Sequence, residues 1–315
     1  MTIENVTLID STTGARASIL AGFGFNCYEF VANLKGREVD VLWSDPDFAS
    51  GTKRPSGSGI PLLFPFPGRL RGTTFPWEGR EYSLEAGDGR GNAIHGFILN
   101  RAWRVLERSP SRVVGQFQAA VDDPAILNQW PADFRVTATY ELAGNRLSSA
   151  FVFENPDDKT LPCGFGAHPY FRLPLGATSS GDACLVTIPA TKHWELVDML
   201  PTGKCSELSR ANAYQQGLRF GEMTFDDVFG GLVFDGDDCV SEIVDPESNT
   251  RLLMRFDRSF RELVVYTPPH RGAICVEPYT CVPGTVGLDV PDVDFGLRVL
   301  QPGESFTSRV ELSVE

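Results

Sequence analysis

The amino-acid sequence predicts an all-β protein, built as one large antiparallel β-sandwich. Three observations lead to this class: short segments of alternating apolar and polar residues, 31 glycines and 22 prolines that separate them, and no long segment with helical periodicity. Alternation of period two places one face of a strand against a core. Strands without intervening helices favour antiparallel connections. A chain of 315 residues can form such a sandwich as a single unit, and we expect residues 1–315 to form one domain.

The clearest strands form a predicted hairpin. Residues 134–142 (FRVTATYEL) and 146–155 (RLSSAFVFEN) flank the turn AGN, and Val136 and Tyr140 point to one face while Thr137 points to the other. Five further segments show a similar pattern, and these are 37–43, 112–119, 250–257, 262–269 and 305–314. Outside the strands, we expect a few helical turns at 124–130 and a polar loop at 44–59.

Composition excludes several classes of function. A net charge of -13 and a pI near 4.8 oppose binding to nucleic acid and to anionic membranes. The chain starts without a basic, then apolar, leader and has no uncharged run long enough to span a membrane, so we expect a soluble cytoplasmic protein. The sequence leaves monomer and homodimer open as its oligomeric state. Its seven scattered cysteines contain no C-x-x-C pair, so neither a disulfide framework nor a zinc cage is indicated.

Glu277 is the most unusual polar residue, because it lies in the apolar segment AICVEPYTCVPGT. In a strand it shares a face with Ala273 and Cys275, and Pro278 is expected to end that strand. Burial would raise the pKa of this carboxyl toward neutral pH, which suits a general base. The alternative is a glutamate that faces solvent at the strand end.

Two of the four histidines lie among aromatic and turn-forming residues. His95 stands in NAIHGF and His168 in AHPYFRL. Either imidazole could exchange a proton near neutral pH, and the aromatic residues after His168 could also stack on a sugar. A structural histidine in a turn is the alternative for each. We expect His193 and His270 to be structural or peripheral.

Three further polar residues stand among apolar neighbours. Arg69 ends the Pro/Phe-rich segment FPFPGR, and its guanidinium could bind two hydroxyls or a carboxylate, or form a structural ion pair. Asp226 and Asp227 lie in TFDDVFGGL between two phenylalanines. One of the two is expected to face inward, and a turn cap is the alternative for both.

Taken in order, the segments PFPGRL, NAIHGF, AHPYFRL, FDDVF and CVEPYTCVPG resemble the motifs of the aldose 1-epimerase (galactose mutarotase) family. The resemblance covers residues 60–285, and five motifs in one order are more specific than any single motif. It implies a large antiparallel β-sandwich of the galactose mutarotase-like supersandwich type, with a sugar cleft on one sheet. It also implies an isomerase of carbohydrate metabolism that interconverts the α and β anomers of an aldose.

The same resemblance implies a role for each candidate. Glu277 corresponds to the base that acts on the anomeric hydroxyl, and His168 to the acid that acts on the ring oxygen. The substrate-binding positions are His95, Arg69 and Asp226, with Asp227 as the alternative to Asp226. Opening a cyclic hemiacetal requires a base and an acid at the two ends of one C–O unit. Neither a metal nor a cofactor is implied.

Departures from the family pattern leave alternatives open. The arginine motif has GRL where many relatives have Asn-Arg-Ile, and SGIPLLFPFPG resembles a branch that acts on hexose 6-phosphates. A phosphate would require cations near the cleft, for which the candidates are Lys53, Arg54, Arg71 and Arg101. A noncatalytic carbohydrate-binding protein is a second alternative. A glycoside hydrolase that uses Asp226 and Glu277 is a third, although it leaves the histidines without a role.

Overall fold

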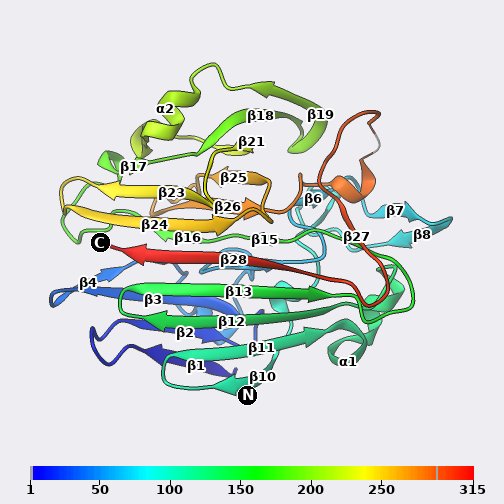
Figure 1. Ribbon diagram of the computed structural model, residues 1–315, viewed down its shortest axis with the longest axis horizontal. Helices are drawn as coiled ribbons and strands as arrows, with labels where there is room; N and C mark the ends of the chain where they lie inside the picture. Colours follow the sequence, from blue (N-terminus) through cyan, green and yellow to red (C-terminus); the bar gives the residue numbers. More distant parts are fainter. Residues whose placement is uncertain (1–2, 289) are drawn as a thin grey trace.

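Antiparallel strands are the main secondary structure of the computed structural model, which describes residues 3–288 and 290–315 (Figure 1). Strands hold 48% of the residues and helices 10%, so the predicted all-β class is confirmed. Two large sheets dominate the molecule, and one four-stranded and three two-stranded sheets accompany them among the described residues. This arrangement confirms the predicted antiparallel sandwich.

The larger sheet has ten strands and contains the predicted hairpin. Its strands in spatial order are β10 (Arg104–Arg108), β11 (Arg112–Gln118), β12 (Arg135–Ala143), β13 (Arg146–Glu154), β28 (Ser305–Val314), β24 (Thr250–Asp257), β23 (Asp238–Asp245), β17 (Leu185–Val186) and β20 (Leu218–Arg219), with β22 (Phe234–Asp235) beside β23. Residues 135–143 pair with 146–154 in unbroken register, and Val136 and Tyr140 are buried as the alternation predicts.

The second sheet has eight strands and carries most of the predicted site residues. Its strands in spatial order are β19 (Leu200–Glu207), β18 (Ala190–Val197), β21 (Asp226–Leu232), β25 (Glu262–Tyr266), β26 (Ala273–Tyr279), β15 (Gly166–Ala167) and β5 (Leu62–Leu63), with β16 (Tyr170–Arg172) also beside β26. On β26, Ile274 and Val276 join the large core, so Cys275, Glu277 and Tyr279 belong to the opposite face of the strand.

Smaller sheets and short helices complete the fold. The strands of these sheets are β1 (Asn5–Ile9), β2 (Arg16–Leu20), β3 (Asn26–Leu34) and β4 (Arg37–Asp40) in one sheet, and the pairs β14 (Leu161–Cys163) with β27 (Arg298–Leu300), β6 (Arg69–Leu70) with β9 (Ala93–Ile94), and β7 (Thr74–Trp77) with β8 (Arg80–Ser83). The α-helices are α1 (Ala119–Asp122) and α2 (Ala211–Gln216), and the 3-10 helices span Phe48–Ser50, Ile98–Asn100, Pro124–Asn128, Gly181–Ala183, Phe220–Glu222 and Thr285–Gly287. Within the described ranges, no helix has the length and apolar character needed to cross a bilayer.

Aromatic side chains fill the core between the two large sheets. The ring of Phe165 lies 4.8 Å from that of Phe151 and 4.6 Å from that of Phe153, measured between centroids. Phe64 packs 4.9 Å from Phe153 on its other side. Each buried aromatic ring removes a large apolar area from water, and edge and offset contacts at these distances add to that gain. The core therefore fixes the inner face of the eight-stranded sheet and leaves its outer face free for the site.

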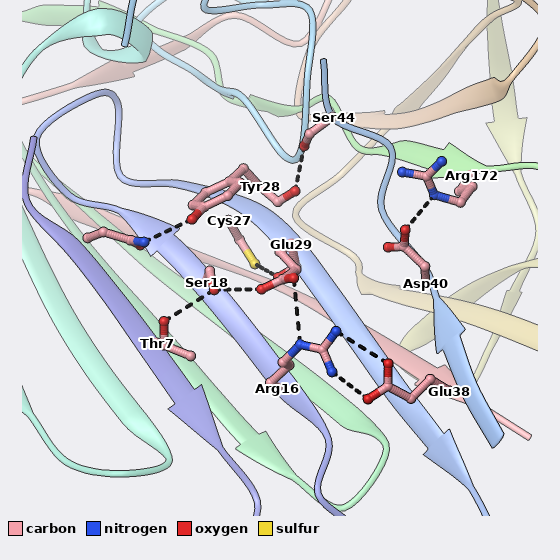
Figure 2. Close-up of polar contacts among 11 residues, drawn as sticks. Thr7, Arg16, Ser18, Cys27, Tyr28, Glu29, Glu38, Asp40, Ser44 and Arg172 are labelled. Carbon is pink, nitrogen blue, oxygen red and sulfur yellow. Dashed lines mark hydrogen bonds and ion pairs between the residues drawn. The ribbon is translucent and has the colours of Figure 1, made fainter. Parts of the chain in front are cut away.

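A polar network lies on the β1–β4 sheet, and a separate ion pair links the end of β4 to β16 of the site sheet (Figure 2). Ser18 Oγ donates to Glu29 Oε2 at 2.7 Å, and Arg16 pairs with Glu38 at 2.7 Å. At the end of β4, the carboxylate of Asp40 accepts a 2.8 Å contact from Arg172 on β16. Exposed ion pairs stabilise a fold only weakly. The backbone N–H of Arg172 also donates to the carbonyl oxygen of Val41 at 2.9 Å, and this backbone pairing holds β16 beside the segment that follows β4.

The expectation that Pro278 ends its strand is wrong. Strand β26 continues to Tyr279, and Pro278 is in register with Leu263 of β25. On the other side of β26, β16 pairs only as far as Cys275 and β15 pairs only with Tyr279. Because the neighbouring strand is interrupted there, a proline without an N–H costs no ladder hydrogen bond on that side. The continuation matters because it places Tyr279 on the same face as Glu277.

All seven cysteines are free thiols, and six are buried. The exception is Cys205, which is partly exposed on β19. Buried free thiols pack as small apolar side chains.

Candidate active site

A cavity of about 300 Å³ opens on the outer face of the eight-stranded sheet. The residues predicted for the site all line it: Arg69, His95, His168, Asp226 and Glu277. They come from β6, the turn after β9, the segment after β15, β21 and β26, which lie far apart in the chain. Folding therefore brings all five predicted side chains around one hollow large enough for a single small ligand.

Glu277 and His168 face each other within the cavity. Nε2 of His168 lies 3.2 Å from Oε1 of Glu277, and the other carboxylate oxygen accepts a 2.8 Å hydrogen bond from the hydroxyl of Tyr279. Only 1% of Glu277 and 6% of His168 is exposed to solvent. A carboxyl and an imidazole in this geometry can pass a proton between them or to a ligand.

Burial shifts both members of this pair toward their neutral forms. Desolvation raises the pKa of Glu277 well above its ordinary value, and the hydrogen bond from Tyr279 opposes that rise. Desolvation also lowers the pKa of His168, with a smaller contribution in the same direction from the positive charge of Arg54. Because the contact keeps one proton between the two groups, the neutral pair and the ion pair differ only in where that proton lies.

Tyr170 holds the His168 ring in place. The two rings are stacked, with centroids 4.9 Å apart and planes within 4° of each other. The Tyr170 hydroxyl donates to the carbonyl oxygen of Ser56 at 3.0 Å, which anchors the tyrosine. Nδ1 of His168 has no hydrogen-bond partner in the part of the chain that the structure describes. The orientation of the imidazole therefore depends on this packing and on Glu277.

His95 lies on a strained turn that aims its ring at the cavity. Its φ is +68°, in the left-handed region that non-glycine residues seldom adopt, and the following Gly96 also has a positive φ. A Cβ at Gly96 would lie 2.0 Å from the carbonyl oxygen of Phe64, so this close approach requires glycine. The N–H of Gly68 donates to Nδ1 of His95 at 3.3 Å. Burial and the nearby His168 lower the pKa of His95, which favours the neutral ring. Because Nδ1 accepts the hydrogen bond from Gly68, the neutral ring carries its proton on Nε2.

Three arginines give one part of the cavity a positive charge. Nε of Arg69 lies 3.4 Å from Oδ2 of Asp88, whose carboxylate also accepts the backbone N–H groups of Arg90 and Asn92. Arg54 and Arg90 line the same cavity, and neither pairs with a carboxylate among the described residues. The positive charge of Arg54 and Arg90 is therefore available to a ligand.

The structure also separates the other candidate cations. Lys53 pairs with Asp45 at 2.9 Å, and Arg101 pairs with Asp123 at 2.7 Å. Neither Lys53 nor Arg71 lines the cavity, whereas Arg101 lines an adjoining hollow. Of the four cations named from the sequence, Arg54 is the one at the predicted site.

Asp226 and Asp227 occupy different environments although they are neighbours in the chain. Asp226 lines the cavity, and burial raises its pKa while Arg69 opposes the rise. Asp227 instead contacts Nε2 of His193 through Oδ1 at 2.8 Å, outside that cavity. Successive residues of a strand point to opposite sides, and here the register of β21 decides which one faces the site.

His270 lies outside the cavity, as its turn position suggested. Its ring stacks on Trp43, with centroids 4.1 Å apart, and its Nδ1 accepts the backbone N–H of Gly272 at 3.0 Å. Both contacts give it a structural role at the rim of the site sheet.

Several residues that line the cavity were not predicted from the sequence. Tyr279 and Tyr266 lie on the site face of adjacent strands, and Asp88 and Arg90 lie in the loop between β8 and β9. Tyr279 stands two residues after Glu277, and it shares the face of Glu277 only because β26 continues past Pro278, where the sequence predicted that the strand ends. The loop residues had no sequence signal, because only the fold shows that 87–92 approaches Arg69.

One group of possible metal ligands occurs in the described residues. Donor atoms of His168, Cys275 and Glu277 all lie within 4.8 Å of one another. The sequence spacing of these three residues matches no common metal-binding motif.

Comparison with known proteins agrees with the geometry. A family model described as aldose 1-epimerase matches residues 9–313. The chain is 28% identical over 147 residues to the uncharacterized protein YphB of Escherichia coli K12, covering 44% of this chain and 47% of that protein. It is 27% identical over 148 residues to the plasmid protein LacX of Lactococcus lactis subsp. lactis, covering 46% and 45%. The chain thus aligns with about half the length of these curated relatives.

Solved structures extend the likeness to the whole chain. A galactose mutarotase-like protein from Clostridium acetobutylicum superposes with a TM-score of 0.86 at 22% identity, covering 100% of this chain and 99% of that one. A putative aldose 1-epimerase from E. coli K12 superposes with a TM-score of 0.77 at 20% identity, covering 99% of both chains. At these identities the likeness shows the fold, and the expected galactose mutarotase-like architecture is confirmed.

Proposed function

The chain belongs to the aldose 1-epimerase family, and from this premise we propose that it is an isomerase that interconverts the α and β anomers of an aldose. The observation that carries the proposal is the 3.2 Å contact between His168 and Glu277 inside a cavity lined by the other predicted residues. Two groups that share one proton and face one small hollow suit a reaction that moves protons at both ends of a single C–O unit.

In the proposed reaction, Glu277 takes the proton from the anomeric hydroxyl O1 while His168 gives a proton to the ring oxygen. The bond between C1 and the ring oxygen breaks, and C1 and O1 form a carbonyl. The open aldehyde then rotates about C1–C2 and closes on its other face, with both proton transfers reversed. The enzyme ends with the same protons it began with, so the reaction is balanced without a co-reactant.

Burial of the pair favours ring opening. The reactive form holds a carboxylate and an imidazolium, and after ring opening Glu277 and His168 are both neutral. Desolvation disfavours charge, and it shifts the pKa of each group toward that neutral form. The hydrogen bond from Tyr279 stabilises the Glu277 carboxylate. It therefore lowers the free energy of the charged pair that ring closure regenerates. Each proton transfer contributes about a hundredfold or more to the rate.

The remaining cavity residues would orient the sugar. Arg69 and the Nε2–H of His95 can donate to the ring oxygen or to hydroxyls, and the carboxylate of Asp226 can accept from hydroxyls. Fixing the sugar in one pose matters because reacting groups must stand about 3 Å from their proton donors and acceptors.

The proposal is tested by following anomer exchange in freshly dissolved α-D-glucose and α-D-galactose, by polarimetry or by exchange NMR. The wild type should speed equilibration, and Glu277→Gln and His168→Asn should lose most of that acceleration while keeping the native circular dichroism. If wild type and both variants all match the spontaneous rate on every aldose tried, the proposal fails. Retained sugar binding in that case would favour the noncatalytic carbohydrate-binding alternative.

A second candidate substrate is an anionic sugar such as a hexose 6-phosphate. The observation in its favour is that Arg54 and Arg90 line the cavity without carboxylate partners, in a chain whose net charge is -13. If this substrate is correct, glucose 6-phosphate should show a higher kcat/KM than glucose, and Arg54→Ala should reduce that preference at least tenfold. Equal values for the two sugars would exclude it.

A further inference from the structure

Cys275 is a buried thiol beside the proposed catalytic pair that the anomer exchange does not use. It lies two residues before Glu277 on β26 and therefore on the same face of the strand. It is fully buried, and its neighbours across the sheet are Tyr170 and Tyr266. Its sulfur lies within 4.8 Å of donor atoms of both His168 and Glu277.

We propose that Cys275, His168 and Glu277 form a binding site for a thiophilic divalent cation of the zinc class, and that an ion bound there blocks anomer exchange. The binding step stands on the geometry of the three donors alone. The inhibition rests on the proposed function, because the ion would take the lone pairs of both proton-transferring groups.

The donor set and spacing suit zinc. Zinc prefers sulfur, imidazole nitrogen and carboxylate oxygen, whereas magnesium and calcium prefer oxygen alone. Two zinc bonds of about 2.0 to 2.1 Å at a tetrahedral angle place their ligand atoms about 3.3 Å apart. The separation of His168 Nε2 and Glu277 Oε1 is 3.2 Å, so these two donors already have the required spacing. A zinc–sulfur bond of about 2.3 Å requires the thiolate about 3.5 Å from each of the other two donors, and the sulfur lies within 4.8 Å of both.

The charges of the three donors would balance a divalent ion bound between these buried side chains. When the metal binds, the Cys275 thiol releases its proton to solvent, and so does the Glu277–His168 pair. A thiolate, a carboxylate and a neutral imidazole then neutralise the two positive charges, which is the condition for burying an ion at low cost. Without the ion, burial and the charge of Glu277 raise the pKa of the thiol, so the empty site keeps Cys275 protonated and unreactive.

The cavity provides the path to the site and the fourth ligand. His168 and Glu277 line the cavity, so an ion can reach them without unfolding of the sheet. Three protein ligands leave one tetrahedral position free, which a water molecule or a sugar hydroxyl from the cavity can fill. The sugar and the ion would therefore compete for the same two side chains.

Cobalt(II) tests the binding step directly, because a thiolate ligand gives it an intense near-ultraviolet charge-transfer band and tetrahedral geometry gives strong visible bands. We expect the wild type to bind one equivalent of cobalt with both features, and zinc to displace it. Cys275→Ser and Cys275→Ala should lose the charge-transfer band and weaken binding by more than about a hundredfold, since loss of an outer-shell partner alone costs tenfold to a hundredfold.

Cys205→Ser is the matched control, because Cys205 is the most exposed cysteine among the described residues and would bind metal adventitiously. It should keep the wild-type cobalt spectrum. Loss of the band in Cys205→Ser, or an unchanged band in Cys275→Ser, overturns the proposal. Circular dichroism of each variant shows whether it has folded.

Activity then tests the inhibition separately. Zinc should inhibit mutarotation in the wild type and in Cys205→Ser, and Cys275→Ser should turn over at a rate close to wild type with at least tenfold lower zinc sensitivity. Full activity in a wild type loaded with one equivalent of zinc would refute the inhibition. If no mutarotation occurs at all while the cobalt spectrum depends on Cys275, the proposed function fails and the metal site stands.

Discussion

Two buried glutamates lie on the same face of the eight-stranded sheet, and they differ in their partners. Glu277 on β26 faces His168 and accepts from Tyr279, whereas Glu262 on β25 accepts from the indole N–H of Trp194 at 2.8 Å. Both are at least 95% buried. Burial raises the pKa of each, that of Glu262 to about 7.

The two glutamates are similarly buried, and they differ in whether the carboxyl has a titratable partner. An indole N–H can only donate, so Trp194 can stabilise a carboxylate but cannot exchange a proton with it. A Cβ on Gly230 would lie 2.6 Å from Oε2 of Glu262, which shows how closely the sheet packs against that group. Glu277 instead has a titratable partner and faces the cavity that holds the other candidate residues. A paired acid therefore separates the candidate catalytic carboxylate from the structural one.

Replacing each glutamate with glutamine tests this comparison. The substitution at Glu277 should cause the largest loss of activity of all the variants. Glu277→Gln should lower kcat for anomer exchange by about 10³-fold, because the amide cannot accept the proton from O1. Glu262→Gln should leave kcat within about twofold, since the amide oxygen can still accept from Trp194. Polarimetry on both variants measures the contrast. Equal losses in the two would show that general burial, and not the pairing with His168, controls activity.

Removal of the acid should have the second largest effect. His168→Asn should lower kcat by about 10²-fold, because asparagine can still donate a hydrogen bond to the ring oxygen but cannot transfer a proton to it. The same polarimetric assay measures this loss. If the variant retains more than half of the wild-type rate, His168 is not the acid. The pairing with His168 would then not distinguish Glu277 from Glu262 as a catalytic group.

Tyr279→Phe should have a smaller effect that appears mainly in the pH profile. The Tyr279 hydroxyl donates to Glu277 and so holds the pKa of that carboxyl lower than burial alone would. Without it the pKa rises further, and a hydrogen bond to a charged group corresponds to about one to two pH units. The acidic limb of kcat/KM, where Glu277 is protonated and inactive, should move to higher pH by that amount. An unchanged limb would show that Tyr279 only packs.

Glu262→Gln has the smallest expected effect on activity, but it should change how the free energy of unfolding depends on pH. The carboxyl of Glu262 has a pKa of about 7 in the folded protein and an ordinary value of 4.5. Between these values the folded state binds more protons than the unfolded state, so stability falls as pH rises and the loss reaches about 3 kcal/mol above pH 7. Glu262→Gln should remove this pH dependence. Urea unfolding at pH 4.5 and pH 8 measures it, and identical pH dependence in variant and wild type would contradict the comparison.

Much of the fold could be predicted from local pattern. Residues 135–143 and 146–154 form the predicted hairpin, and 250–257 and 305–314 are strands with the predicted bounds. Period-two alternation depends only on residues close together in the sequence, so it predicts strands without knowledge of the tertiary structure. The termination of β26 could not be predicted, because whether Pro278 interrupts a sheet depends on which strands lie beside it.

The candidate site could be predicted only in part for the same reason. Segment patterns and the family resemblance identified the five side chains, but the environments of Asp226 and Asp227 depend on how β21 pairs with its neighbours. The choice of Arg54 over Lys53 depends on where the loop at 44–59 folds back. Cys275 had no sequence signal as a metal ligand, since its proposed partner His168 lies more than a hundred residues away.

The sequence by itself determined the all-β class, the strand faces and the fact that Cys275 and Glu277 share one of them, because side-chain direction in a strand follows from backbone geometry alone. Only the tertiary structure decided that His168 stands 3.2 Å from Glu277 and that the pair is dry. Distance and dielectric environment depend on every segment that packs around a group. Those two quantities turn a carboxyl and an imidazole into a pair that can exchange a proton.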